Sequence, residues 1–147
     1  MGELLTGYHN FCVAPTRATS VADTFYGALY LASASINAGT TAYTVTGEVS
    51  GTGYTAGGVA VTNATAPIAA NSSSTAGVAY WTPSSSLTYT TVTLTTAFDS
   101  VLIYNYTQGG RAVSVHTFGS QTITAGTFTL TMPTNSTTTA LLRLSTT

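Results

Sequence analysis

Ser114, His116 and Asp99 come nearest to a catalytic set in this sequence. A serine nucleophile needs a histidine base and an acid that orients the histidine. Ser114 and His116 are two residues apart, so on a strand they point to the same face. The chain has no Gly-x-Ser-x-Gly turn to expose a nucleophile, and with 15 serines one near a histidine is expected by chance. We therefore expect His116 to be an interface or surface residue.

The acidic residues do not form an obvious pair. Glu3, Asp23, Glu48 and Asp99 are the only carboxylates, and they are far apart in sequence. Glycoside hydrolysis needs two carboxylates across one cleft. We expect each acid to cap a turn or to pair with an arginine, and we expect no enzymatic activity.

His9 and Cys12 form a single His-x-x-Cys pair, in a chain with one cysteine and two histidines. A structural zinc site needs four ligands, so one chain cannot supply it alone. A zinc site shared across a symmetric oligomer is the alternative to a small buried cysteine at position 12.

The glycine-rich segment 47–58 lacks the Gly-Lys-Ser/Thr of a phosphate loop. We expect no cofactor and no metal.

The composition excludes several classes of partner. Only 7 of 147 residues are charged, the net charge is -1, and there is no lysine. Three arginines cannot neutralise a track of phosphates or hold the chain on an anionic membrane. No apolar stretch is long enough for a transmembrane helix, and the first residues lack the basic region of a signal peptide. The 33 threonines and 15 serines make the chain polar by hydroxyl groups instead of charge.

Strand and turn signals follow one another from residue 24 onward, at roughly ten-residue spacing. Residues 24–32 are apolar on both faces, residues 42–48 alternate with Tyr43 and Val45 on one face, and residues 127–132 have period two. Further strands are expected at residues 87–96, 99–105 and 111–118. Residues 50–58 and 64–76 have loop composition. We expect an all-β fold, a single β-sandwich or jelly-roll-like domain of about eight or nine antiparallel strands, with threonines on its outer faces.

Residues 1–22 differ from the rest and are expected to form a short N-terminal arm, so that residues 23–147 make the sandwich domain. Apolar residues in the arm recur at three- and four-residue spacing, which allows one or two helical turns. So few charges on one domain suggest that its surface is covered in an assembly. The side chains expected at interfaces are Leu4, Leu5, Tyr8, Phe11, Tyr54, Trp81 and Tyr106. Tyr80-Trp81 or Tyr104-Asn105-Tyr106 would alternatively line a sugar-binding face.

The order of several segments resembles a group of small virion proteins of tailed bacteriophages. The likeness covers roughly residues 24–145 and is carried by ALYLA at 28–32, GEVSGTGYTAGG at 47–58, YW at 80–81, VLIYN at 101–105, RAV at 111–113 and GTFTLTMP at 126–133. The resemblance implies a structural part of the virion and supplies no catalytic residues.

The resemblance leads to an expected function and location. We expect a capsid decoration (cement) protein, made in the host cytoplasm and incorporated in the virion. Its partners would be the major capsid protein and further copies of itself, with a trimer favoured. A tail, neck or fibre component is the first alternative, and a carbohydrate-binding module is the second.

Overall fold

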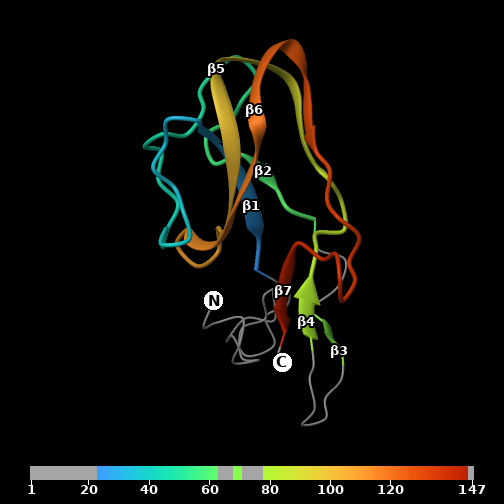
Figure 1. Cartoon of the computed structure of the whole chain (residues 1–147). Helices are drawn as coiled ribbons and strands as arrows, with labels where there is room; N and C mark the ends of the chain where they lie inside the picture. The colour runs from blue at the N-terminus through green and yellow to red at the C-terminus, as the bar shows by residue number, and fades with distance from the viewer. Residues whose placement is uncertain (1–22, 63–67, 71–77, 146–147) are drawn as a thin grey trace. The chain divides into compact units, whose positions relative to one another are not determined.

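The computed structural model describes residues 23–62, 68–70 and 78–145. All the regular structure in these residues is β, and all strand pairs are antiparallel (Figure 1). The strands are β1 (Phe25–Leu31), β2 (Val59–Ala60), β3 (Ile68–Ala70), β4 (Val78–Trp81), β5 (Leu87–Asn105), β6 (Arg111–Leu130) and β7 (Leu142–Ser145). The expected all-β class is therefore confirmed for the described residues.

The strands belong to two compact units. The hairpin unit consists of Thr24–Val61 and Leu87–Leu130, and its sheet has the order β2-β1-β5-β6. The tryptophan unit includes the described parts of Thr62–Ser86 and Thr131–Thr147, and its sheet has the order β3-β4-β7. Residues 1–22, which we expect to form an arm, lie outside the described residues.

The hairpin unit is built on one long, bent hairpin. β5 has 19 residues and β6 has 20, and they pair from Leu87↔Leu130 to Asn105↔Arg111. Several register shifts interrupt the pairing between Tyr89 and Ser100. β-Bulges of this kind bend strands and increase their twist. Figure 1 shows the hairpin rising on one side, turning over at the top and descending on the other.

Contacts of β1 with both halves of β5 confirm the bend. Gly27 pairs with Ile103, in the second half of β5. A Cβ on Gly27 would nevertheless lie 2.5 Å from Leu87 Cδ1, at the first residue of the same strand. The Tyr89 hydroxyl also donates to the Gly27 carbonyl, at 2.7 Å. The first half of β5 therefore packs against the face of the sheet that its second half helps to form.

The bent hairpin encloses the core of this unit. Twelve of the largest fully buried side chains in the described residues are aromatic or aliphatic, and most come from β1 and β5. Phe98, Phe118 and Phe128 form a cluster with ring centroids between 5.1 and 6.0 Å apart. On the solvent side of β6, Thr127 and Thr129 are exposed, as the period-two pattern predicts.

β1 is buried on both faces because a second layer covers its other side. Ala28, Tyr30, Leu102 and Tyr104 form a buried cluster there. The segment between β1 and β2, residues 32–58, supplies the apolar side chains that pack on this cluster, among them Ala34, Ile36 and Tyr43. The segment has almost no regular structure, so side chains must hold it in place.

The tryptophan unit is small. Trp81, the last residue of β4, and Thr82, which follows it, are buried, with 1% and 4% of their surface exposed. The Thr82 hydroxyl accepts from the Leu141 amide at 2.9 Å, just before β7. Ser84 bonds through both its amide and its hydroxyl to the Thr62 carbonyl. These bonds fix the chain on either side of the three-stranded sheet.

Some details differ from the sequence-based expectation. Eight or nine strands are not confirmed: the described residues contain seven, because the strands expected at 87–96 and 99–105 are continuous, as are those expected at 111–118 and 127–132. Residues 42–48 form no strand, and Val45 is 67% exposed whereas Tyr43 packs inward. The expected loop 64–76 contains the short strand β3.

Candidate functional site

The segment between β1 and β2 is organised around one buried carboxylate. Glu48 is 8% exposed and accepts three hydrogen bonds. The donors are the Tyr43 hydroxyl at 2.6 Å, the Tyr54 hydroxyl at 2.7 Å and the Gly57 amide at 2.7 Å. We call Glu48, Tyr43, Tyr54 and Gly57 the Glu48 cluster. Three donors offset the cost of removing a carboxylate from water.

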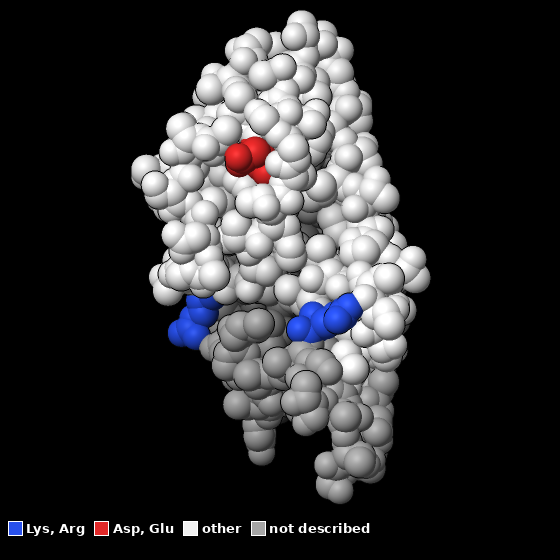
Figure 2. Space-filling view, in the orientation of Figure 1, with Lys and Arg blue, Asp and Glu red and all other residues white. Residues whose placement is uncertain are grey.

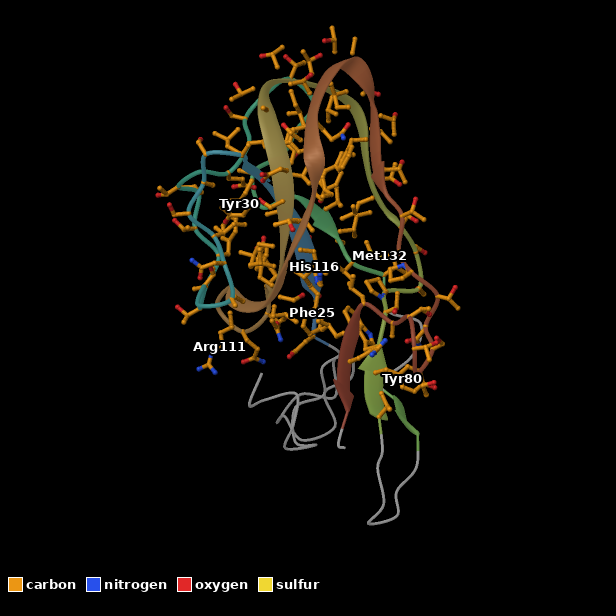
Figure 3. All side chains as sticks on the ribbon, viewed as in Figure 1. Phe25, Tyr30, Tyr80, Arg111, His116 and Met132 are labelled. Carbon is orange, nitrogen blue, oxygen red and sulfur yellow. The ribbon has the colours of Figure 1, made fainter. Side chains whose placement is uncertain are left out.

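Further tyrosines connect the segment to the sheet beneath. The Tyr30 hydroxyl, on β1, donates to the Thr44 carbonyl at 2.5 Å. The Tyr104 hydroxyl, on β5, donates to the Gly57 carbonyl at 2.9 Å. In the other direction, the Tyr54 hydroxyl accepts from the Leu29 amide at 3.0 Å. The side of the sheet that carries Tyr30 is therefore the side that the segment covers (Figure 3).

Aromatic stacking supports the same arrangement. Tyr43 stacks on Tyr104 with ring centroids 4.6 Å apart, and Tyr54 stacks on Tyr89 at 5.9 Å. Each tyrosine of the Glu48 cluster thus binds the carboxylate with its hydroxyl and a strand residue with its ring. A segment without regular structure becomes a fixed surface in this way.

The environment of the cluster keeps its tyrosines protonated. Burial, together with the nearby Glu48 carboxylate, raises the pKa of Tyr104 to about 12. The pKa values of Tyr43 and Tyr54 are raised by burial and by their hydrogen bonds to Glu48. The hydroxyls therefore remain hydrogen-bond donors. Both oxygens of Glu48 are engaged by Tyr43, Tyr54 and Gly57, so the carboxylate fixes the segment on the sheet.

Ser114 and His116 do lie together, as their spacing predicts. Their Oγ and Nε2 atoms are 2.9 Å apart. Ser114 is opposite Ile103 and His116 is opposite Val101, and burial lowers the pKa of His116. Within the described residues no hydrogen bond joins Asp99 to His116. Two members of the candidate triad are therefore in contact and the third is not.

No group of three or more metal-binding side chains occurs in the part of the chain that the structure describes. His9 and Cys12 lie outside that part, so the shared zinc site stays an untested alternative.

The residues expected at interfaces have different environments. Leu4, Leu5, Tyr8 and Phe11 lie outside the described residues. Trp81 is 1% exposed, so its ring is inside the chain, and Tyr54 is partly buried in the Glu48 cluster. Tyr106 is 63% exposed, with its ring centroid 5.1 Å from that of Tyr26. Of the described candidates, Tyr106 is the one with an exposed side chain.

The Glu48 cluster was missed by the sequence analysis. Its signal in the sequence is a glutamate flanked by two tyrosines, Tyr43 and Tyr54, in a segment where it is the one charged residue. We expected a strand at residues 42–48 and a loop at residues 50–58, and neither expectation requires a buried acid.

The surface carries few charged side chains. Figure 2 shows acidic and basic atoms in small separate areas of one face, and the other described residues on that face are uncharged. The described charged residues are Asp23, Glu48, Asp99, Arg111 and Arg143, and of these Glu48 is buried. Arg143 donates to the Thr138 carbonyl in its own unit. This surface offers hydroxyl and backbone groups instead of charges.

Comparisons with known proteins give no relative: no family model, curated protein or solved structure matches the chain. Over its described residues the structure contains no helix with the length and apolarity needed to cross a membrane.

Proposed function

We propose that this chain is a structural protein of a tailed-phage virion, a capsid decoration (cement) protein that binds the outside of the shell and stabilises the contacts between capsomers. The observation that carries the proposal is the nearly uncharged, hydroxyl-rich surface of an all-β chain. We also propose that the fold is of the β-sandwich type, since the bent hairpin packs one half of β5 against the other.

The physical basis of shell binding would be the burial of surface. With so few charges, attraction between opposite charges contributes little, and each buried Å² of apolar surface contributes about 25 cal/mol. Repetition over many equivalent sites on a symmetric shell multiplies a small stabilisation per copy. Threonine and serine hydroxyls keep the free chain wettable and form hydrogen bonds when it is covered.

The phage assignment rests on the resemblance of residues 24–145 to small virion proteins. The choice of the shell over the tail rests on organisation: the sequence has no fibrous repeat and no coiled-coil heptads. The proposed partners are the major capsid protein and other copies of this chain, with a trimer favoured, and no nucleic acid or membrane is involved. The proposed site of synthesis is the host cytoplasm, followed by incorporation into the virion.

A tail, neck or fibre-associated role is the first alternative, and the number of copies per particle separates it from decoration. Quantitative mass spectrometry of purified virions of the encoding phage is expected to give on the order of hundreds of copies, since equivalent shell sites are numerous. A count of about a dozen or fewer would favour the tail or neck. Absence from purified particles would reject both virion roles.

A carbohydrate-binding module is the second alternative, and it requires an exposed aromatic platform. Tyr106 and Tyr26 are the described residues that come nearest to one. Calorimetric titration of the isolated chain with neutral oligosaccharides tests this reading. Binding that is lost in Tyr106→Ala and kept in Val45→Ala, an equally exposed apolar control, would favour the module over decoration.

We propose that residues 1–22 form an arm that clamps a neighbouring subunit, and deleting these residues tests that role. A clamping arm predicts that particles assembled with the shortened chain lose integrity at a lower temperature than particles with the full chain. Unchanged incorporation together with unchanged heat resistance would remove the arm from the proposal.

A further inference from the structure

Among the described residues, β6 forms an edge of the larger sheet that no further strand covers beyond residue 112. It is the last strand in the order β2-β1-β5-β6 and has 20 residues. From residue 112 to residue 130 it contains no charged residue and no proline. Natural sheet edges are usually short or carry charges, prolines or a covering segment, because unpaired backbone groups bind other strands. An edge of this length and composition therefore needs a partner.

The hydrogen bonds of β1 show which backbone groups of β5 point toward β6. The carbonyls of Phe25 and Leu29 accept bonds from Val61 and Val49, on the side of β1 away from β5. Bonding direction alternates along an antiparallel strand. Ala28 therefore bonds toward β5, where its partner is Leu102.

The same alternation continues across β5. Since Leu102 bonds toward β1, Val101 and Ile103 bond toward β6, where their partners are His116 and Ser114. The backbone groups of Val115 and Thr117 then point away from the sheet. Among the hydrogen bonds of the described residues, none outside the β5–β6 ladder reaches the backbone of Val115 or Thr117.

The neighbouring part of this edge is already paired within the chain. The Ala112 amide donates to the Thr41 carbonyl at 2.9 Å, and the Tyr43 amide donates to the Gly110 carbonyl at 2.8 Å. The bridge Ala42↔Arg111 between these bonds is antiparallel. A turn at residues 37–40, closed by the Thr40 amide on the Asn37 carbonyl, then ends this pairing. The edge thus accepts an antiparallel segment up to residue 112 and is left without one beyond it.

We propose that a second copy of this chain occupies the open edge, with the two β6 strands antiparallel about a two-fold axis at His116. Val115 of each copy is then opposite Thr117 of the other, and each such pair exchanges both of its N–H···O bonds. Ser114 is opposite Phe118. This contact rests on the proposed function, because it gives the proposed self-association a surface. A two-fold axis relates two copies, so the contact predicts a dimer instead of the trimer favoured above.

Charge favours a second copy over a foreign strand. The paired stretch contains no ionised side chain at neutral pH, so two identical edges meet without like-charge repulsion. The half-buried His116 is neutral there because burial lowers its pKa. Pairing copies along β6 also removes the edge at which uncontrolled aggregation would start.

The first test is the mass of the full chain in solution, measured by light scattering after size exclusion. The expected mass is that of a dimer. Thr117→Pro removes an outward amide and leaves the β5–β6 ladder intact, and Thr117→Lys adds a charge at the edge. Both variants are expected to be monomers with unchanged circular dichroism. Thr46→Lys is the matched control, an exposed threonine with the same added charge, and it is expected to remain a dimer.

The second test is amide hydrogen exchange in the unaltered chain, which does not depend on any variant folding. Ser114 and His116 are expected to be protected at all concentrations, whereas Val115 and Thr117 become protected only as the dimer forms. A monomeric mass at every concentration would overturn the pairing. A trimer, or a dimer that survives both Thr117 substitutions with Val115 and Thr117 still exchanging freely, would overturn it too. Hundreds of copies on particles would still support decoration in those cases, so the two proposals fail separately.

Discussion

Glu48 shows how a single charged side chain organises a segment that lacks regular structure. Its carboxylate binds two tyrosine hydroxyls and one amide, and those tyrosines stack on residues of the sheet. The acid therefore holds this segment on the sheet. A segment rich in glycine and threonine has little apolar surface to bury, so directional bonds must replace hydrophobic packing.

Removing the Glu48 carboxylate is expected to destabilise the hairpin unit strongly. Glu48→Ala leaves Tyr43, Tyr54 and the Gly57 amide without their acceptor, at an expected cost of about 3 kcal/mol in the free energy of unfolding. Glu48→Gln keeps one acceptor oxygen and should cost less, about 1 kcal/mol. Urea unfolding followed by tyrosine fluorescence measures both. Equal stability of Glu48→Ala and a surface control, Thr46→Ala, would contradict the role of the cluster.

His116 makes stability depend on pH in a predictable direction. Burial lowers its pKa in the folded chain below the ordinary value of 6.5. As the pH falls below about 6.5, the unfolded chain takes up a proton that the folded chain does not, so folding stability decreases. His116→Gln is expected to flatten this part of the stability–pH curve. Parallel curves for the two proteins between pH 7 and pH 5 would show that His116 titrates normally.

Some of the side-chain contacts could be predicted from the sequence, and others could not. Ser114 and His116 share a face because residue spacing on a strand determines it. The contact of Glu48 with Tyr43 and Tyr54 was not predictable, because it depends on how a segment without periodicity folds over β1. The burial of Trp81 was likewise not evident from its neighbours Tyr80 and Thr82.

At the scale of elements, the strands with strong patterns were predictable. β1 is buried on most of its length, as its run of apolar residues on both faces indicates. The strand expected at residues 42–48 was wrong because alternation alone does not distinguish a strand from a segment held by side chains. The continuity of β5 was missed because the threonine-rich residues 87–96 and the apolar residues 99–105 have different patterns and were expected to form two strands, whereas they are one strand with register shifts between Leu94 and Ser100.

Glycines in the segment before β2 allow the close contact of that segment with β1. Gly58 has φ +78°, and a Cβ there would lie 1.8 Å from the Gly27 carbonyl oxygen. Gly109, in the turn after β5, has φ +69° but no atom within 4 Å of its Cβ position. The two glycines thus share a left-handed backbone and differ in the space around them.

This difference gives a matched pair of variants. Gly109→Ala is expected to cost about 1 kcal/mol, from backbone strain alone. Gly58→Ala adds a clash with the β1 backbone and should cost about 3 kcal/mol or more. Thermal and urea unfolding measure the difference. Similar losses for the two variants would mean that the segment moves away from β1 without penalty.

At the scale of the whole molecule, the scarcity of charge determines how the proposed association would depend on salt. The net charge is -1 and the charged residues are few. Association through uncharged surfaces is not screened by salt, and it is strengthened by salts that are excluded from protein surfaces.

The proposed binding to shells and to other copies is therefore expected to change little as sodium chloride is raised, and to strengthen in sodium sulfate. Sedimentation of purified particles at increasing salt, with the bound copies quantified by mass spectrometry, tests this. Progressive release of the protein by sodium chloride would instead indicate binding through the few arginines and acids.

The long hairpin also has a consequence for the order of folding. β5 and β6 are joined by a short turn, whereas the contacts of β1 with this hairpin join residues far apart in sequence, such as Thr24 and Thr107, which are 83 residues apart. Closing the short turn costs far less chain entropy, so the hairpin is expected to form before β1 docks. During synthesis, β1 and the segment after it must then wait, unpaired, until residue 105 has left the ribosome. A chain whose first strand is completed last is exposed for that interval, and its hydroxyl-rich, nearly uncharged surface must keep it from aggregating.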